Sequence, residues 1–191
     1  MRLFAAVLCL ALSLSAAAAA APGWIRPEVA YSATRTMTVG GHEISGPLHY
    51  DDGKERFEMS MDGARHIMIR REDRQRVYMV MPDMGMAMEM VFDGSNGMPS
   101  AGDYADLQPE ELGRETIGGE AVTKYRIEAG EGGESYTVLI WATDDGIALR
   151  MEGATAEGGF EMQLSDLERG PQPADLFEVP AGMQIMAVPG Q

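Results

Sequence analysis

The sequence predicts a mainly β protein, in which about ten or eleven strands curl around one apolar face and a short helix partly closes that face. Two observations support this fold class. Turn signals made of Gly and Asp recur about every 8 to 12 residues, as in "YDDGKE" at 50–55 and "TDDGI" at 143–147. Between the turns, apolar and polar residues alternate, which is the pattern of an antiparallel sheet with one buried face.

The first 20 residues have the three parts of a secretory signal peptide. Arg2 is followed by an apolar run from Leu3 to about Leu14, and Ala18 and Ala20 satisfy the small-x-small cleavage pattern. We therefore expect residues 1–20 to be removed and residues 21–191 to form a single domain in the periplasm. Cys9 would leave with the signal peptide, so we expect no disulfide, thiolate metal site or cysteine-linked lipid in the mature chain. No later run approaches the ~20 apolar residues of a membrane helix, and we expect no membrane span there.

The charge distribution excludes one class of partner. The formal net charge is −15, so phosphate backbones repel the chain and nucleic acid is not an expected partner. Seven cations nevertheless fall within residues 54–76: Lys54, Arg56, Arg65, Arg70, Arg71, Arg74 and Arg76. The favoured interpretation is solvated strand faces and turns. The alternative is a positive patch that meets an anionic head group or a partner.

Individual strands follow from the alternation. In "RFEMSM", residues 56–61, Phe57, Met59 and Met61 share one face. In "GFEMQLSD", residues 159–166, the apolar residues again fall at every second position. Each of these segments is predicted to bury one face.

The segment "SYTVLIWA", residues 135–142, is apolar on both faces. We therefore expect this strand to be covered on both sides. The covering helix is placed at "YADLQPEELG", residues 104–113, with Gly113 as its C-terminal stop.

The segment "MPDMGMAMEM", residues 81–90, contains five methionines. Met84, Met86, Met88 and Met90 alternate, so on a strand they would share one face about 7 Å apart. The small and charged residues between them, at 85, 87 and 89, are expected to face outward. Pro82 resets the alternation, so the segment is predicted to be the second half of a hairpin whose first strand carries Met79 and Met81.

Two interpretations of these methionines stay open. Thioethers are soft ligands that suit Cu(I). Methionine is also an adaptable filler of apolar space, and this interpretation is favoured because other segments use methionine as freely. A mixed copper site that combines methionines with one of the three imidazoles, His42, His49 and His66, is a further alternative, but no metal-ligand spacing such as HxxxH marks it.

The sequence offers little for catalysis. Ser60, Ser95 and Ser100 lack a GxSxG setting, and the Asp pairs at 51–52 and 144–145 precede glycines, as turn formers do. There is no P-loop and no Rossmann glycine pattern. We expect neither an enzyme nor a cofactor.

Four segments resemble a known family: "SGPLHYDDGKERFEMSMDGARHIMIRREDRQRVYMVMPDMGMAMEM", "GGEAVTKYRIEA", "VLIWATDDGIALRMEG" and "PADLFEVPAGMQIM". Together they resemble the periplasmic lipoprotein-carrier superfamily, of the outer-membrane lipoprotein-sorting type, and within it an uncharacterised branch of secreted bacterial proteins. The resemblance spans about Ser32 to Met186. It implies a curved, unclosed antiparallel β-barrel, or half-barrel, with one or two short helices over a concave face that holds acyl chains. Unlike the carriers, which begin with a long amphipathic helix, this chain has only "PGWIRPEVAY" before its first strand.

The expected function is non-catalytic binding of an acyl chain, a lipid or a lipoprotein in a concave apolar cavity. The expected ligand-binding residues are Phe57, Met59, Met84, Met86, Met88, Met90, Tyr136 and Trp141. The alternative function is a Cu(I)-binding protein that uses the methionine-rich hairpin. A third class is an interaction protein with envelope proteins as partners, recognised through a sheet edge or the basic residues.

Overall fold

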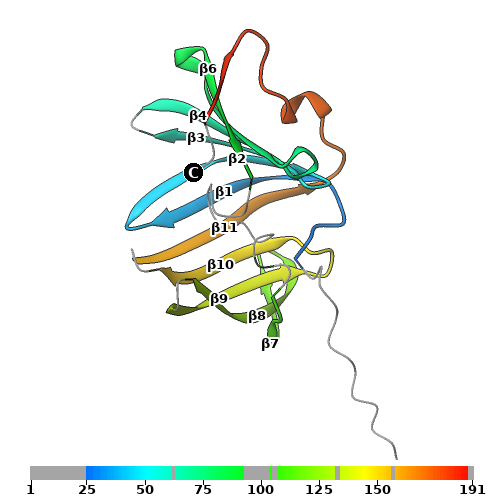
Figure 1. Cartoon of the computed structure of the whole chain (residues 1–191). Coiled ribbons are helices and arrows are strands. Elements are labelled where there is room, and N and C mark those ends of the chain that lie inside the picture. The colour runs from blue at the N-terminus through cyan, green and yellow to red at the C-terminus, as the bar shows by residue number, and fades with distance from the viewer. Residues whose placement is uncertain are drawn as a thin grey trace, which may run out of the picture.

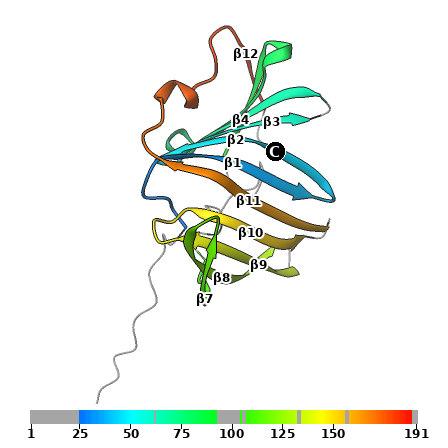
Figure 2. The same cartoon turned by 180° about the vertical axis from the view of Figure 1, so that it is seen from behind.

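The computed structural model describes residues 25–61, 63–92, 104, 107–131, 134–155 and 158–188. The proposed signal peptide lies outside these residues. Twelve strands form one sheet in the order β12-β6-β5-β4-β3-β2-β1-β11-β10-β9-β8-β7. The sheet is strongly curved, and its two edges, β12 and β7, lie at opposite ends of that order (Figures 1 and 2). The prediction of a mainly β, unclosed and largely antiparallel sheet is confirmed, with twelve strands instead of about ten or eleven.

The strands alternate with tight turns along the chain. Their bounds are β1 Tyr31–Val39, β2 His42–Asp51, β3 Lys54–Met61, β4 Ala64–Arg71, β5 Arg76–Met81, β6 Met86–Val91, β7 Glu110–Ile117, β8 Glu120–Glu131, β9 Glu134–Thr143, β10 Ala148–Thr155, β11 Gly158–Arg169 and β12 Gln184–Ala187. Short 3-10 helices lie between some of the described strands, at η1 Glu72–Arg74, η2 Pro82–Met84 and η4 Ala174–Phe177.

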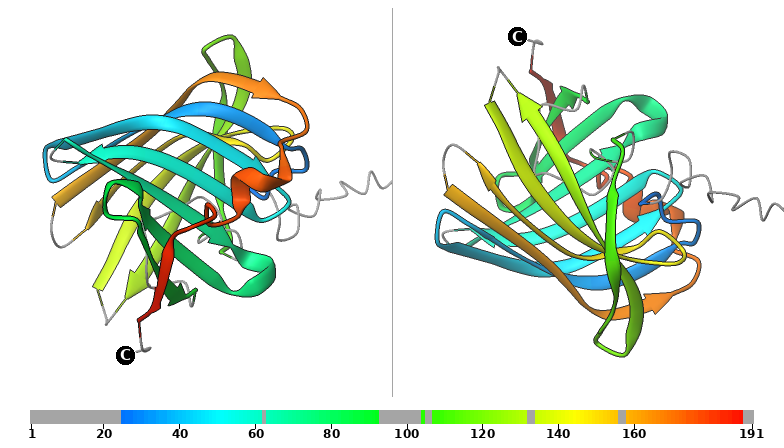
Figure 3. Two further views of the ribbon diagram at one scale, coloured as in Figure 1. Left: turned by 90° about the horizontal axis from the view of Figure 1, so that it is seen from above. Right: turned by 90° about the horizontal axis from the view of Figure 1, so that it is seen from below.

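Two pairings are not between consecutive strands. β1 pairs antiparallel with β11 and joins the N-terminal hairpins to the C-terminal ones. β12 pairs parallel with β6, whereas every other neighbouring pair is antiparallel. β12 therefore returns the C-terminal segment to the edge of the N-terminal half (Figure 3).

β2 and β3 approach each other unusually closely where their ladder ends. Their ladder is paired from Leu48 and Phe57 to the turn, but not at Gly46. A Cβ at Gly46 would lie 1.9 Å from the carbonyl oxygen of Glu58 on β3. Only glycine allows β3 to fold this closely over β2.

The helix expected at residues 104–113 is wrong. Glu110–Ile117 is the edge strand β7, and Gly113 lies where the β7–β8 register shifts, with a φ of +132°. A glycine marks a β-bulge as readily as a helix end, so this signal was ambiguous. Among the described residues, the helical elements are short 3-10 turns, and none is long and apolar enough to cross a membrane.

The core has two parts. The main cluster takes residues from most strands, including Leu48, Phe57 and Ile140, all fully buried. A smaller cluster lies on the opposite face of β4–β6 and is made of Ile67, Ile69, Val80 and Ala87, with Tyr78, Val179 and Met183 packed against it. Because Val179 and Met183 belong to the C-terminal segment, that segment covers the outer face there.

Candidate functional site

A cavity opens at one end of the concave face. Its apolar wall includes Tyr31, Met162 and Leu164, and its polar wall includes Arg35 and Glu55. The remaining lining residues are Ile25, Arg26, Pro27, Tyr50, Gly53, Arg70, Glu72, Gly146 and Ala148. The space inside is about 60 Å³, which exceeds what one water molecule needs.

The polar wall is built on a buried ion pair. Both terminal nitrogens of Arg35 on β1 donate to the carboxylate of Glu55 on β3, each at 2.8 Å. The two side chains are only 5% and 9% exposed. Burial alone would raise the pKa of Glu55, but the charge and hydrogen bonds of Arg35, together with the charge of Arg70, hold that pKa below its usual value. Glu55 is therefore an ionised acceptor and not a proton donor.

Two tyrosines form the adjoining wall. The rings of Tyr31 and Tyr50 stack with their centroids 5.3 Å apart, and the backbone N–H of Gly53 donates to the Tyr50 hydroxyl at 3.1 Å. Burial is the main reason that the pKa of each phenol is raised above its usual value. Both phenols stay protonated at neutral pH and offer hydrogen bonds without charge.

The N-terminal segment closes one side of the cavity. Ile25 is 1% exposed, and the backbone N–H of Glu28 donates to the carbonyl of Asp145 at 3.1 Å. A Cβ at Gly146 would lie 2.4 Å from the carbonyl oxygen of Arg26. The segment thus packs directly on the β9–β10 turn, and a larger ligand would have to displace it.

The residues expected to bind ligand are only partly brought together: the registers of β3–β6 place Phe57, Met59, Met86, Met88 and Met90 on one face of the sheet, and Met84 and Trp141 lie elsewhere. Phe57 and Met59 lie on β3 with exposures of 0% and 3%, inside the main core. Trp141 is also buried. Its neighbour Ile140 pairs with Met151, and Met151 pairs with Met162 of the cavity wall, so Ile140 faces the cavity side. Trp141 instead pairs with Arg150. Trp141 therefore lies on the face opposite the cavity.

On that outer face Trp141 is covered by charged side chains. Lys124 and Arg150 lie 4.5 and 5.2 Å from its ring centroid, and its indole N–H donates to Glu115 at 3.0 Å. These groups cover the second face of β9, for which the sequence predicted a helix. Tyr136 also lies on β9, but its side chain is outside the described residues.

The methionine hairpin differs from expectation at one position. Met84 is not on a strand but in η2, where it is 69% exposed. Ala87 lies on the outer face, opposite the methionines, and is fully buried there because the C-terminal segment covers that face. Met86, Met88 and Met90 do alternate on β6 and are half-buried. Ligand binding by the eight residues stays a prediction, since none of the seven whose side chains are described lines the cavity.

The cavity residues Arg35 and Glu55 carried a signal in the sequence. Glu55 lies two residues before Phe57, and Arg35 two before Met37, so each shares the apolar face of its strand. A charge on the apolar face of a strand must be paired or lie in a cavity. Glu55 was missed because it ends the segment "DDGKE", which was assigned to a turn.

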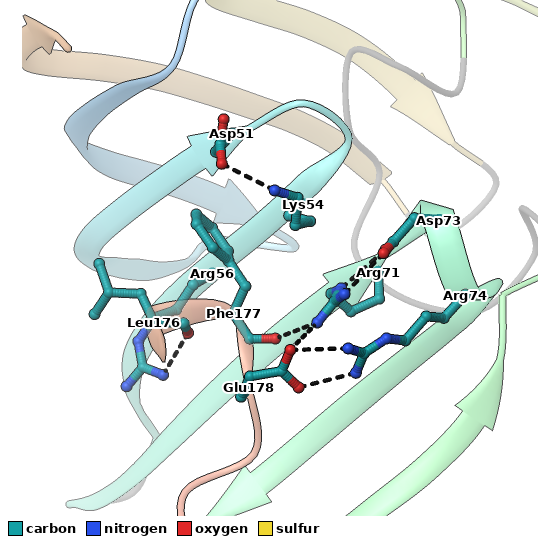
Figure 4. A network of polar contacts seen from close by, with 9 residues as sticks. All are labelled: Asp51, Lys54, Arg56, Arg71, Asp73, Arg74, Leu176, Phe177 and Glu178. Carbon is teal, nitrogen blue, oxygen red and sulfur yellow. Dashed lines mark hydrogen bonds and ion pairs between the residues drawn. The ribbon is translucent and has the colours of Figure 1, made fainter. Parts of the chain in front are cut away.

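Part of the basic cluster contacts the protein's own C-terminal segment (Figure 4). Arg56 donates to the carbonyl of Leu176 at 3.0 Å, and Arg71 to the carbonyl of Phe177 at 3.1 Å. Arg71 and Arg74 both bind the Glu178 carboxylate, at 2.6 and 2.9 Å. These three arginines are thus neither simply solvated nor a free patch for an anionic partner.

The described residues contain no cluster of three or more His, Cys, Asp or Glu that could hold a metal ion. His49 instead hydrogen-bonds through Nδ1 to the side-chain oxygen of Gln172 at 2.8 Å. A hard-metal centre therefore has no donor set in this part of the chain.

Comparison with solved structures shows the fold. An uncharacterised conserved protein from Thermus thermophilus matches with a TM-score of 0.58 and 13% identity, over 84% of this chain and 91% of that one. MucB in the Pseudomonas aeruginosa MucA/MucB complex matches with a TM-score of 0.54 and 16% identity, over 87% of this chain and 60% of that one. The chain thus spans about six-tenths of the length of MucB. A putative outer membrane lipoprotein-sorting protein domain from Vibrio parahaemolyticus matches more distantly, with a TM-score of 0.38 and 11% identity, over 81% of this chain and 92% of that one.

The sequence itself identifies a family. A comparison with curated proteins finds no significant match. The family model described as "Domain of unknown function (DUF4412)" matches residues 36–148, more than half of the chain. The chain therefore belongs to the DUF4412 family.

Proposed function

We propose that this protein is a non-catalytic binding protein of the periplasm that holds an amphipathic molecule, such as a fatty acid or a lipid, in the concave side of its sheet. The observation that carries the proposal is the cavity in which the apolar side chains of Met162 and Leu164 meet the buried Arg35–Glu55 pair. A site with one apolar and one polar wall fits a ligand with the same two parts.

The size of the cavity defines how such a ligand sits. About 60 Å³ accommodates a head group and the first carbons of a chain, whereas the rest of the chain needs new space. Ile25 and Tyr104 are buried against the main core at 1% and 7% exposure and come from segments outside the strands. Their displacement would open space for the chain along the main core. Each buried methylene then contributes about 0.8 kcal/mol.

The chemistry of the cavity supports binding over catalysis. The Glu55 carboxylate is held ionised by Arg35, and Tyr31 and Tyr50 are held protonated. Proton transfer at neutral pH needs a group whose pKa lies near the working pH. These residues can orient a polar group without exchanging a proton with it.

The fold comparison supports a second class of partner. MucB has been crystallised in complex with MucA(peri), so a protein of the cell envelope is a further candidate. Chemical cross-linking of the purified protein to a candidate envelope protein, followed by mass spectrometry of the linked residues, would test this class. Absence of linked pairs would count against it.

Displacement of a fluorescent fatty acid tests the proposed function. The cavity variant is Leu164→Trp, and Ala148→Ile is a milder variant of the same wall. Both fill the space, so we expect at least tenfold weaker binding. Val39→Trp is the matched control, because Val39 is 42% exposed at the far end of β1, and it should bind as the wild type does.

Melting temperatures of the variants separate lost binding from lost folding. A wild-type protein that ignores fatty acids and phospholipids would overturn the proposal. Equal affinity of the folded Ala148→Ile variant and the Val39→Trp control would do so as well.

A further inference from the structure

Two sets of methionines in the described strands differ in burial. Met37, Met59, Met68, Met151 and Met162 are between 1% and 4% exposed and fill the main core. Met79, Met81, Met86 and Met88 are only half-buried, and Met186 is 39% exposed. Filling apolar space explains the first set. Met79 also packs against the main core, but filling apolar space does not account for Met186, which is exposed, or for the alignment of these thioethers at one corner of the sheet.

The strand register aligns three of these thioethers. Met186 on β12 lies opposite Met88 on β6, and Met88 lies opposite Met79 on β5. Residues in register on neighbouring strands share a face, with Cβ atoms about 4.5–5.5 Å apart. Met79, Met88 and Met186 thus form one row across three strands, and Met81 and Met86 form the adjacent pair.

The C-terminal segment brings the third sulfur into this row. The backbone N–H of Gln184 donates to the carbonyl of Gly85, and that of Val188 to the carbonyl of Glu89, both at 2.9 Å. These bonds fix β12 on β6 at both of its ends. Met186 therefore has a defined position beside Met88, although almost one hundred residues separate them in the chain.

This arrangement has the chemistry of a soft-metal site. Three neutral thioethers on flexible side chains can converge on one ion, and thioether ligands select Cu(I) over hard cations. We propose that Met79, Met88 and Met186, with Met81 or Met86 as a fourth ligand, bind a soft monovalent cation, Cu(I) or its analogue Ag(I). The site lies outside the amphipathic-ligand cavity and does not depend on the function proposed for that cavity.

Titration of the purified protein with Ag(I), which needs no reductant, tests the site. Methionine methyl NMR should show saturable shifts at Met79, Met88 and Met186 with one equivalent of Ag(I). X-ray absorption should show three or four sulfur neighbours around the ion. Micromolar Ag(I) that shifts none of these methyl signals would overturn the proposal.

Leucine variants test which sulfurs bind while keeping apolar volume. Met186→Leu should weaken Ag(I) binding at least tenfold, and the Met79→Leu, Met88→Leu, Met186→Leu triple variant should abolish it. Met61→Leu is the control, since Met61 is 43% exposed at the end of β3, and it should leave the affinity unchanged. If the Met186→Leu variant binds Ag(I) with wild-type affinity, the three-strand site is refuted. Circular dichroism of each variant checks that it is folded.

Discussion

The buried Arg35–Glu55 pair gives the sharpest stability prediction. Glu55→Gln keeps the shape of the side chain but removes its charge, so the Arg35 guanidinium stays buried without its counter-ion. Both side chains are less than a tenth exposed and share two hydrogen bonds of 2.8 Å. Breaking such a pair costs about 3–5 kcal/mol, and we expect the lower end because glutamine can still accept one hydrogen bond.

Urea denaturation measures this cost, with two comparisons. Asp144→Asn removes the partner of Arg114 in an ion pair of similar length, 2.9 Å, whose Asp144 and Arg114 side chains are 74% and 56% exposed. That change should cost no more than about 1 kcal/mol. A double-mutant cycle with Arg35→Met should show a coupling of about 1–3 kcal/mol between Arg35 and Glu55. A cost for Glu55→Gln as small as that of Asp144→Asn would refute the buried pair.

Three further predictions concern pH, backbone packing and the C-terminal segment. The pKa of Glu55 is lowered in the folded state, so its ionised carboxylate contributes fully to the free energy of unfolding above the unfolded pKa of about 4.3. That contribution is lost as the pH falls through the folded pKa. The free energy of unfolding of the Glu55→Gln variant should therefore depend less on pH below about pH 5. Gly46→Ala should destabilise the fold by about 1–3 kcal/mol or more in urea denaturation, because the added Cβ would lie 1.9 Å from the carbonyl oxygen of Glu58. Gly159→Ala should cost less, because there the nearest atom would be 3.6 Å from the added Cβ. Phe177→Ala removes a side chain that is 1% exposed, so it should cost up to about 3–5 kcal/mol of stability and speed hydrogen exchange in β12. Ile185→Ala is the control, because Ile185 is 51% exposed, and it should do neither. Unchanged hydrogen exchange in the Phe177→Ala variant would contradict a role of Phe177 in holding the C-terminal segment.

The strands were predictable because their burial follows local alternation. Phe57 and Met59 on β3, and Met162 and Leu164 on β11, are buried as the period of two indicated. Met61 has the same parity but is 43% exposed, since it lies at the end of its strand. Local pattern thus identifies the buried face but not where burial stops.

The features that the sequence did not predict depend on contacts between distant segments. β12 has four residues, all exposed, and its pairing with β6 leaves no periodic signal in the sequence. The same pairing places Met186 beside Met88, so the three-strand row of thioethers was not visible in the hairpin alone. The cavity likewise needs β1, β3 and β11 together, and only the misplaced charges of Arg35 and Glu55 indicated it.

Methyl NMR during a fatty acid titration tests the central claim most directly. With decanoate below its micelle concentration, the methyl signals of Met162 and Leu164 should shift saturably, and Met84, 69% exposed in η2, should not respond. Saturable shifts at the two cavity residues would place the ligand in the concave face. No shift at either residue, or shifts confined to the exposed methionines, would contradict the proposed binding site.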